Sequence, residues 1–189
     1  MLHLHVFVAA IDAAAPERQP VIAWTFTMVA PMQTDLVFAL AVGIGIVAGL
    51  RSLTAPAAVS WAACLGWLDL EGTALAFMGS TAAVAIFSLL AIVEYAGDLH
   101  PATPRRTTPG PLIARVVTGA LSGACLCVSA SRSVALGVAL GGLGAVAGAF
   151  AGYEARTRLV AALGVKDRVV ALFEDLVTIA LAWLVVSWP

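Results

Sequence analysis

The sequence has 189 residues, of which 61% are hydrophobic and only 11% are charged, and its net charge is −1. Its mean hydropathy is +1.00, whereas a soluble domain carries about 25% charged residues. This composition excludes an ordinary soluble domain and predicts an integral membrane protein whose main partner is the lipid bilayer. The nearly balanced charge offers no basic surface, so we expect no nucleic-acid partner.

Residues 1–31 differ from the rest of the chain. They are weakly apolar, end in a polar patch, and lack the basic start and cleavage site of a secretory signal. Met28 and Met32 both precede the first strongly apolar run, so we expect the protein to start at one of them. The interpretation is a poorly ordered N-terminal extension over 1–31 and a single transmembrane helical domain over 32–189.

Six apolar runs come after this extension, and they predict an all-α fold, a polytopic membrane helix bundle. A full crossing needs about 20 residues, and the first two runs are short. A tilted pair or a re-entrant hairpin is therefore an alternative for those two. The predicted segments are Leu36–Leu50, Leu53–Leu70, Thr73–Asp98, Pro111–Ser131, Ser133–Tyr153 and Asp167–Trp188.

The positive charges favour six crossings. With six spans the loops alternate in side, and of the 10 Lys and Arg residues all but Arg18 and Arg132 fall on one side. The positive-inside rule makes that side cytoplasmic and places both termini outside. If Leu53–Leu70 did not cross, the bias would vanish. Because arginine greatly outnumbers lysine, and alanine and glycine are abundant, the composition suggests a bacterium, and we expect the inner membrane.

Glycines at spacings of three and four mark three of the predicted segments. Small residues at this spacing let helix backbones approach closely in lipid, so we expect the first, fourth and fifth segments to form the tightly packed centre. The same glycine-rich faces also suit a homo-oligomer. These glycines are Gly45, Gly49, Gly119, Gly123, Gly137, Gly141, Gly144, Gly148 and Gly152.

A charged stretch broken by proline, Glu94–Arg115, separates the third segment from the fourth. Its four prolines exclude one continuous helix. Charges at the inner margins of apolar runs are costly unless they are paired or hydrated. Together with other charges at the same margin they form a candidate polar constellation: Arg51, Glu94, Asp98, Arg115, Arg158, Glu174 and Asp175.

This constellation has three interpretations. It is a set of structural ion pairs that hold helix ends together in a membrane scaffold; or a proton-coupled path for a small solute or ion, with Glu94, Glu174 and Asp175 as sites. In the third interpretation it is the site of an intramembrane enzyme or binding protein that acts on a lipid head group. The arginines would then bind the phosphate and the acids a divalent cation. The sequence has no catalytic or cofactor motif, which favours a protein that is not an enzyme and has no cofactor.

Arg115 gives the most specific geometric prediction. It lies near the start of the fourth segment, and Glu94 and Asp98 lie at the end of the third, at the same margin. A lone arginine inside the membrane is unfavourable, and a carboxylate on the next helix removes much of that penalty. We therefore expect Arg115 to pair with Glu94 or Asp98, or with Glu174 or Asp175.

From about Leu36 to Val186 the sequence carries a set of short motifs: Ala48-Gly49, Glu94, Asp98, Pro101, Arg115, Gly119-Ala120, Tyr153, Arg158 and Glu174-Asp175. These motifs resemble those of a family of small bacterial membrane proteins, domain of unknown function 4126. The resemblance implies an integral α-helical membrane protein with no established activity. Where many members carry a lysine and a second acid, this sequence has Leu99 and Pro104, which weakens any metal site in that stretch.

Overall fold

The computed structural model describes residues 20–98, 107–165 and 167–187, and for residues 20–34, 98 and 168 it describes the backbone only. The described residues form six α-helices and one short 3-10 helix, and they contain no strand. The elements are α2 (Pro20–Leu50), α3 (Thr54–Cys64), η1 (Ala76–Gly79), α4 (Thr81–Asp98), α5 (Pro109–Ser129), α6 (Val134–Leu163) and α7 (Asp167–Val186).

The chain divides into two compact units, residues 1–36 and residues 37–189. Residues 1–19 lie outside the described part, and residues 20–36 form the first part of α2. The extension expected over 1–31 therefore stays a prediction. The second unit holds the end of α2 and all the other described helices.

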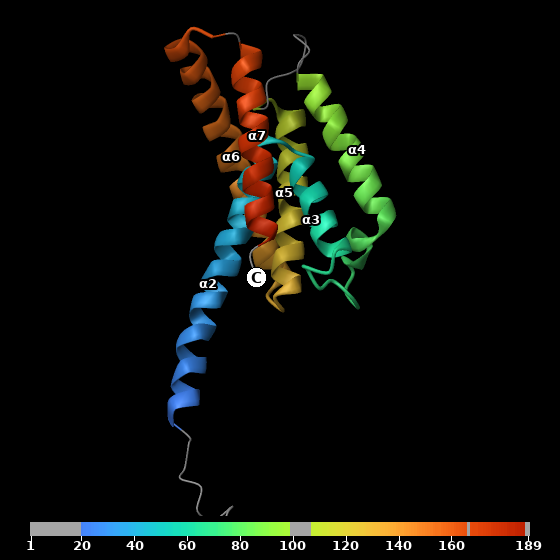
Figure 1. The fold of residues 1–189 in the computed structure, drawn as a ribbon, viewed down its shortest axis with the longest axis vertical. Helices are drawn as coiled ribbons and strands as arrows, with labels where there is room; N and C mark the ends of the chain where they lie inside the picture. The colour runs from blue at the N-terminus through green and yellow to red at the C-terminus, as the bar shows by residue number, and fades with distance from the viewer. Residues whose placement is uncertain (1–19, 99–106, 166, 188–189) are drawn as a thin grey trace, which may run out of the picture. The chain divides into compact units, whose positions relative to one another are not determined.

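Within residues 37–189 the α-helices run alternately in opposite directions (Figure 1). Because of this alternation, the ends of α2, α4 and α6 meet the starts of α3, α5 and α7 at one end of the bundle, called here the charged end. Among the described residues three helices are long and apolar enough to cross a membrane, Pro109–Ser129, Val134–Leu163 and Val169–Val186, and two shorter apolar helices accompany them. The predicted all-α polytopic membrane bundle is confirmed.

The second predicted segment forms a shorter helix than expected. Helix α3 has 11 residues and ends at Cys64, not at Leu70. At a rise of about 1.5 Å per residue it is about 16 Å long, too short to cross the membrane alone. The chain turns at Gly66, whose φ of +78° suits glycine. The segment after this turn is not helical, although Leu68 and Leu70 in it are buried.

Further boundaries differ from the prediction. Helix α2 begins at Pro20 instead of Leu36, and α5 runs over Pro109–Ser129 instead of Pro111–Ser131. Helix α4 begins at Thr81 instead of Thr73, because the hydroxyl of Ser80 accepts a hydrogen bond from the Ala83 N–H (3.1 Å) and so caps the first turn. Helix α6 continues past the predicted end at Tyr153 to Leu163, where Gly164 takes a left-handed conformation with φ +62°.

Glycines of α2, α5 and α6 pack against one another, as predicted. A Cβ added to Gly119 would lie 2.7 Å from the carbonyl oxygen of Gly141 and 2.8 Å from the Cβ of Ala145. A Cβ added to Gly45 would overlap the same Gly141 carbonyl. Helix backbones approach this closely only where side chains are absent. A homo-oligomer through these faces stays a prediction, since the faces already contact helices of the same chain.

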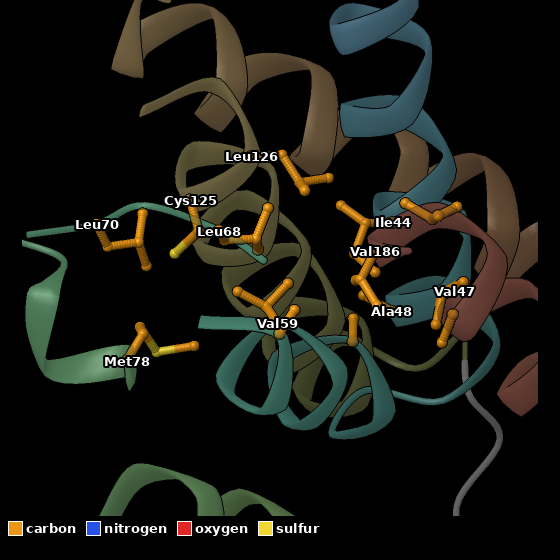
Figure 2. Packing of buried hydrophobic residues seen from close by; sticks show 14 of the residues in the cluster. Ile44, Val47, Ala48, Val59, Leu68, Leu70, Met78, Cys125, Leu126 and Val186 are labelled. Atoms are coloured by element: carbon orange, nitrogen blue, oxygen red, sulfur yellow. The ribbon is translucent and has the colours of Figure 1, made fainter. Parts of the chain in front are cut away.

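The remaining core brings α3 and α7 onto this centre. Figure 2 shows Ile44 of α2 beside Val186 of α7, and Val59 of α3 facing the region of Leu68 and Cys125. All of these side chains are buried. The apolar core thus places the end of α2 and the start of α3 against α5 and α7, and the charged side chains of four helices meet there.

Candidate functional site

Arg51 directly follows α2, and its side chain is only 1% exposed. It forms an ion pair with Asp175 of α7. Its guanidinium also lies over the ring of Tyr95 on α4, 5.4 Å from the ring centre. A carboxylate and an aromatic face are the two kinds of group that compensate a buried guanidinium for lost water. Arg51 therefore joins α2 to α4 and α7.

Glu94 of α4 caps the start of α3. Its Oε1 accepts hydrogen bonds from the backbone N–H and the hydroxyl of Ser52, both at 2.8 Å. Its Oε2 accepts a third from the N–H of Leu53, also at 2.8 Å. The first N–H groups of a helix have no partner within the helix. A carboxylate from a neighbouring helix supplies one and also suits the positive end of the helix dipole.

Arg115 of α5 binds the carbonyl oxygens at the end of α2. Its Nη1 donates to the carbonyl oxygens of Gly49 (3.0 Å) and Leu50 (2.9 Å), which have no partner further along α2. Its Nη2 lies 3.8 Å from Glu94 Oε1. The predicted pairing of Arg115 with Glu94 is confirmed, and Arg115 also binds the end of α2. Arg51, Glu94, Arg115 and Asp175 together are named the charged cluster.

The remaining predicted residues fall in other places. Glu174 lies 3.7 Å from Arg156, which also binds Asp167 through two hydrogen bonds of 2.9 and 2.6 Å. Arg158 is not brought into the charged cluster: it pairs with Glu154 on the exposed face of α6, at 2.7 Å. The side chain of Asp98 lies outside the described residues, as do Arg105 and Arg106.

Beside the charged cluster lies a groove of about 400 Å³ between α3, α4 and α7. At the charged end it is lined by Thr54 and Tyr95, whose hydroxyl oxygens are 2.7 Å apart. At its other end Trp67 and Trp183 pack edge to face, with ring centroids 5.0 Å apart. Among the described residues that line it there is no Asp, Glu, Lys or Arg. The groove is therefore an apolar site with two hydroxyls at one end.

Small side chains make room for this groove, and its rim is open. Ala58 and Ala182 line it where larger residues would fill it. Its rim carries Trp61 (50% exposed) and Ile92 (62% exposed). The Trp61 indole N–H donates to the hydroxyl of Ser88 across the groove wall, at 3.1 Å. The sequence signalled none of this, because apolar residues in a membrane helix look alike whether they pack or line a site.

Long apolar helices around a glycine-packed centre, with charges buried at one end, define a polytopic α-helical membrane protein. Residues 38–189 match the family described as Domain of unknown function (DUF4126), and the chain belongs to that family. This confirms the resemblance found in the sequence. No curated protein and no solved structure matches the chain.

Proposed function

We propose that this protein binds the hydrocarbon chain of a membrane lipid in the groove between α3, α4 and α7, and that it is not an enzyme. The single observation that carries the proposal is the groove itself. Its volume of about 400 Å³ lies in the range of about 300–1,000 Å³ that is typical of small-molecule sites. Its exposed rim lies on membrane helices, so lipid chains are the molecules that reach it.

The charged cluster has a structural role in this proposal. Arg115 and Glu94 satisfy the backbone groups at the end of α2 and the start of α3, and Arg51 is paired with Asp175. A transport path would require acids lining a polar cavity near the middle of the membrane. The groove has an apolar lining instead, which favours lipid binding over proton-coupled transport.

The membrane orientation is part of the same proposal. We place the charged end in the cytoplasmic leaflet of a bacterial inner membrane, with both termini outside. The support is the position of Arg51, Arg115 and Arg156 at one end of the bundle, together with the positive-inside rule. A reporter that is active only in the cytoplasm should be active when fused at residue 103 and silent at residue 189; the reverse result would contradict this orientation.

The binding test uses a phospholipid with a photoreactive diazirine in its acyl chain, added to the full chain in bilayer vesicles. After illumination, peptides from α3, α4 and α7 should carry most of the label. Ile92→Trp on the groove rim should remove most of this labelling. The matched control is Leu143→Trp, at an equally exposed position (67%) on α6, which should leave it unchanged.

A second obstruction works inside the groove. Ala58→Phe should reduce labelling of the groove peptides, and Ala147→Phe on the exposed face of α6 should not. Folded yield is measured for every variant. Equal labelling of the groove and of the outer face of α6 in the wild-type protein would mean that lipids only surround the bundle, and it would overturn the proposal.

A further inference from the structure

We infer that the groove selects an ester-linked glycerolipid of the leaflet at the charged end, holding its ester carbonyl at Thr54 and Tyr95. This inference rests on the proposed function and adds to it the chemical class and the direction of the ligand. The polar part of the lipid lies at the two hydroxyls, and its chain runs along α3 toward Trp67 and Trp183.

A count of hydrogen-bond donors favours an acceptor on the ligand. Thr54 and Tyr95 together bring two O–H groups, and their mutual hydrogen bond uses one of them. Within the described part of the chain, no other hydrogen bond is made by these hydroxyls. One O–H is thus left to donate. An ester carbonyl offers only acceptor oxygen, whereas an ether-linked chain has no carbonyl to offer.

The surroundings of Tyr95 strengthen it as a donor. The guanidinium of Arg51 lies 5.4 Å from its ring centre, and a nearby cation polarises an O–H toward donation. Thr54 is 7% exposed, so its hydroxyl lies in a weakly solvated place where a hydrogen bond to a ligand has little competition from water. Both hydroxyls belong to side chains that line the groove.

Length sets the leaflet. Helix α3 forms one wall of the groove, and its 11 residues span about 16 Å, close to the roughly 15 Å of hydrocarbon in one leaflet. A chain entering from the charged end therefore fits along α3 and reaches the Trp67–Trp183 pair, which lies at the far end. A lipid of the opposite leaflet would bring only the tip of its chain to this aromatic end, and its ester group would lie too far away to reach Thr54 and Tyr95.

The head group should matter little. Arg51 and Arg115 are 1% and 7% exposed and already have partners in the charged cluster. They are therefore not presented to a lipid phosphate. This distinguishes the inference from an arginine site for phosphate: recognition lies at the ester linkage, below the head group, and lipids with different head groups should bind equally well.

The experiment compares two phosphatidylglycerol probes with identical chains and photoreactive groups, one joined by ester bonds and one by ether bonds. The wild-type full chain in vesicles should label its groove peptides about fivefold more with the ester probe, since one hydrogen bond contributes about 1 kcal/mol. The double variant Thr54→Val/Tyr95→Phe should still be labelled but should lose this preference. Phosphatidylethanolamine ester probes should match the phosphatidylglycerol ester probe.

The matched control is Thr157→Val/Tyr153→Phe, a threonine and tyrosine pair on α6, which should keep the fivefold preference. Equal labelling of wild-type groove peptides by ester and ether probes would overturn the inference while leaving the proposed function intact. Labelling of neither probe in the groove would instead overturn the proposed function. If the double variant fails to fold, the comparison of the two probes on the wild-type protein still decides the matter.

Discussion

The two sides of the bundle are built on opposite principles. Where α2, α5 and α6 meet, backbone touches backbone, so that a Cβ on Gly141 would overlap the Gly119 carbonyl oxygen. Where α3, α4 and α7 meet, alanines and tryptophans enclose a groove of about 400 Å³. In lipid, helices associate through close packing rather than through the hydrophobic effect. The glycine side is therefore closely packed, whereas the other side keeps a groove.

The charged cluster connects the two sides. Arg115 on α5 belongs to the tightly packed side and reaches Glu94 on α4. Arg51, at the end of α2, reaches Asp175 on α7. A short helix such as α3 has too little surface to hold its own position, and Glu94 fixes its start. Disrupting the cluster should therefore loosen the groove side first.

The largest effect is expected for Arg51→Met. It removes the ion pair with Asp175, whose side chain is 14% exposed, and breaking a buried pair costs about 3–5 kcal/mol. We expect a loss of this size in the free energy of unfolding, measured by titration with sodium dodecyl sulfate. Arg132→Met, at an exposed position, is the control and should change little. A loss at Arg51 no greater than at Arg132 would show that the cluster does not hold the two sides together.

Gly141→Ala tests the glycine side directly. The new methyl group would overlap the backbone of Gly119, which cannot move aside as a side chain can. We therefore expect the free energy of unfolding to fall by about 2–3 kcal/mol. The next residue is the matched control, because a Cβ on Gly142 would be 3.7 Å from Val116, an ordinary contact. Gly142→Ala should keep or raise the thermal midpoint, since alanine is the better helix former. Equal behaviour of the two variants would contradict the packing of α5 against α6.

The glycine faces and the end of the first segment were accessible from the sequence because each leaves a local signal. The end of the first segment at Leu50 and the contacts of Gly45 and Gly141 agree with the structure. The length of α3 was not accessible. Leu68 and Leu70 are buried although they lie in a turn region. Their hydropathy is the same as that of residues in a spanning helix, so the sequence did not show that the helix ends before them.

The site was predictable in part for a similar reason. Opposite charges at one margin predicted the pair of Arg115 and Glu94. The sequence shows how deep in the membrane each charge lies, because it shows where each charge stands along its apolar segment. Which charge faces inward depends on helix phase, and residues two apart on a helix point about 200° apart. This is why Arg156 faces α7 while Arg158, which the charge pattern favoured, faces away. Tyr95 carries no charge, so nothing in the sequence distinguished it.

Arg115→Met and Glu94→Gln measure how far the two sides are coupled. Each single change removes charged hydrogen bonds at a helix end and should lower the free energy of unfolding of the protein by about 2 kcal/mol. The two groups are 3.8 Å apart and each has other partners. The double variant should therefore lose nearly the sum of the two, with a coupling energy below about 1 kcal/mol in a double-mutant cycle. Restoration of stability in the double variant would mean that the ion pair, not the helix ends, is their main role.

The smallest effect concerns the exposed end of α6, which belongs to neither side. Arg158 and Glu154 are 78% and 55% exposed, and such a pair one helical turn apart contributes about 0.3–0.5 kcal/mol. Arg158→Ala should leave stability almost unchanged, and added salt should remove any difference. Arg156→Ala is the comparison, because Arg156 is 17% exposed and faces Glu174, which is 12% exposed. We expect Arg156→Ala to lower the free energy of unfolding by about 1 kcal/mol, because less water screens the pair of Arg156 and Glu174. Equal losses for the two arginines would mean that burial, the property separating the charged cluster from the surface, does not determine what these charges contribute.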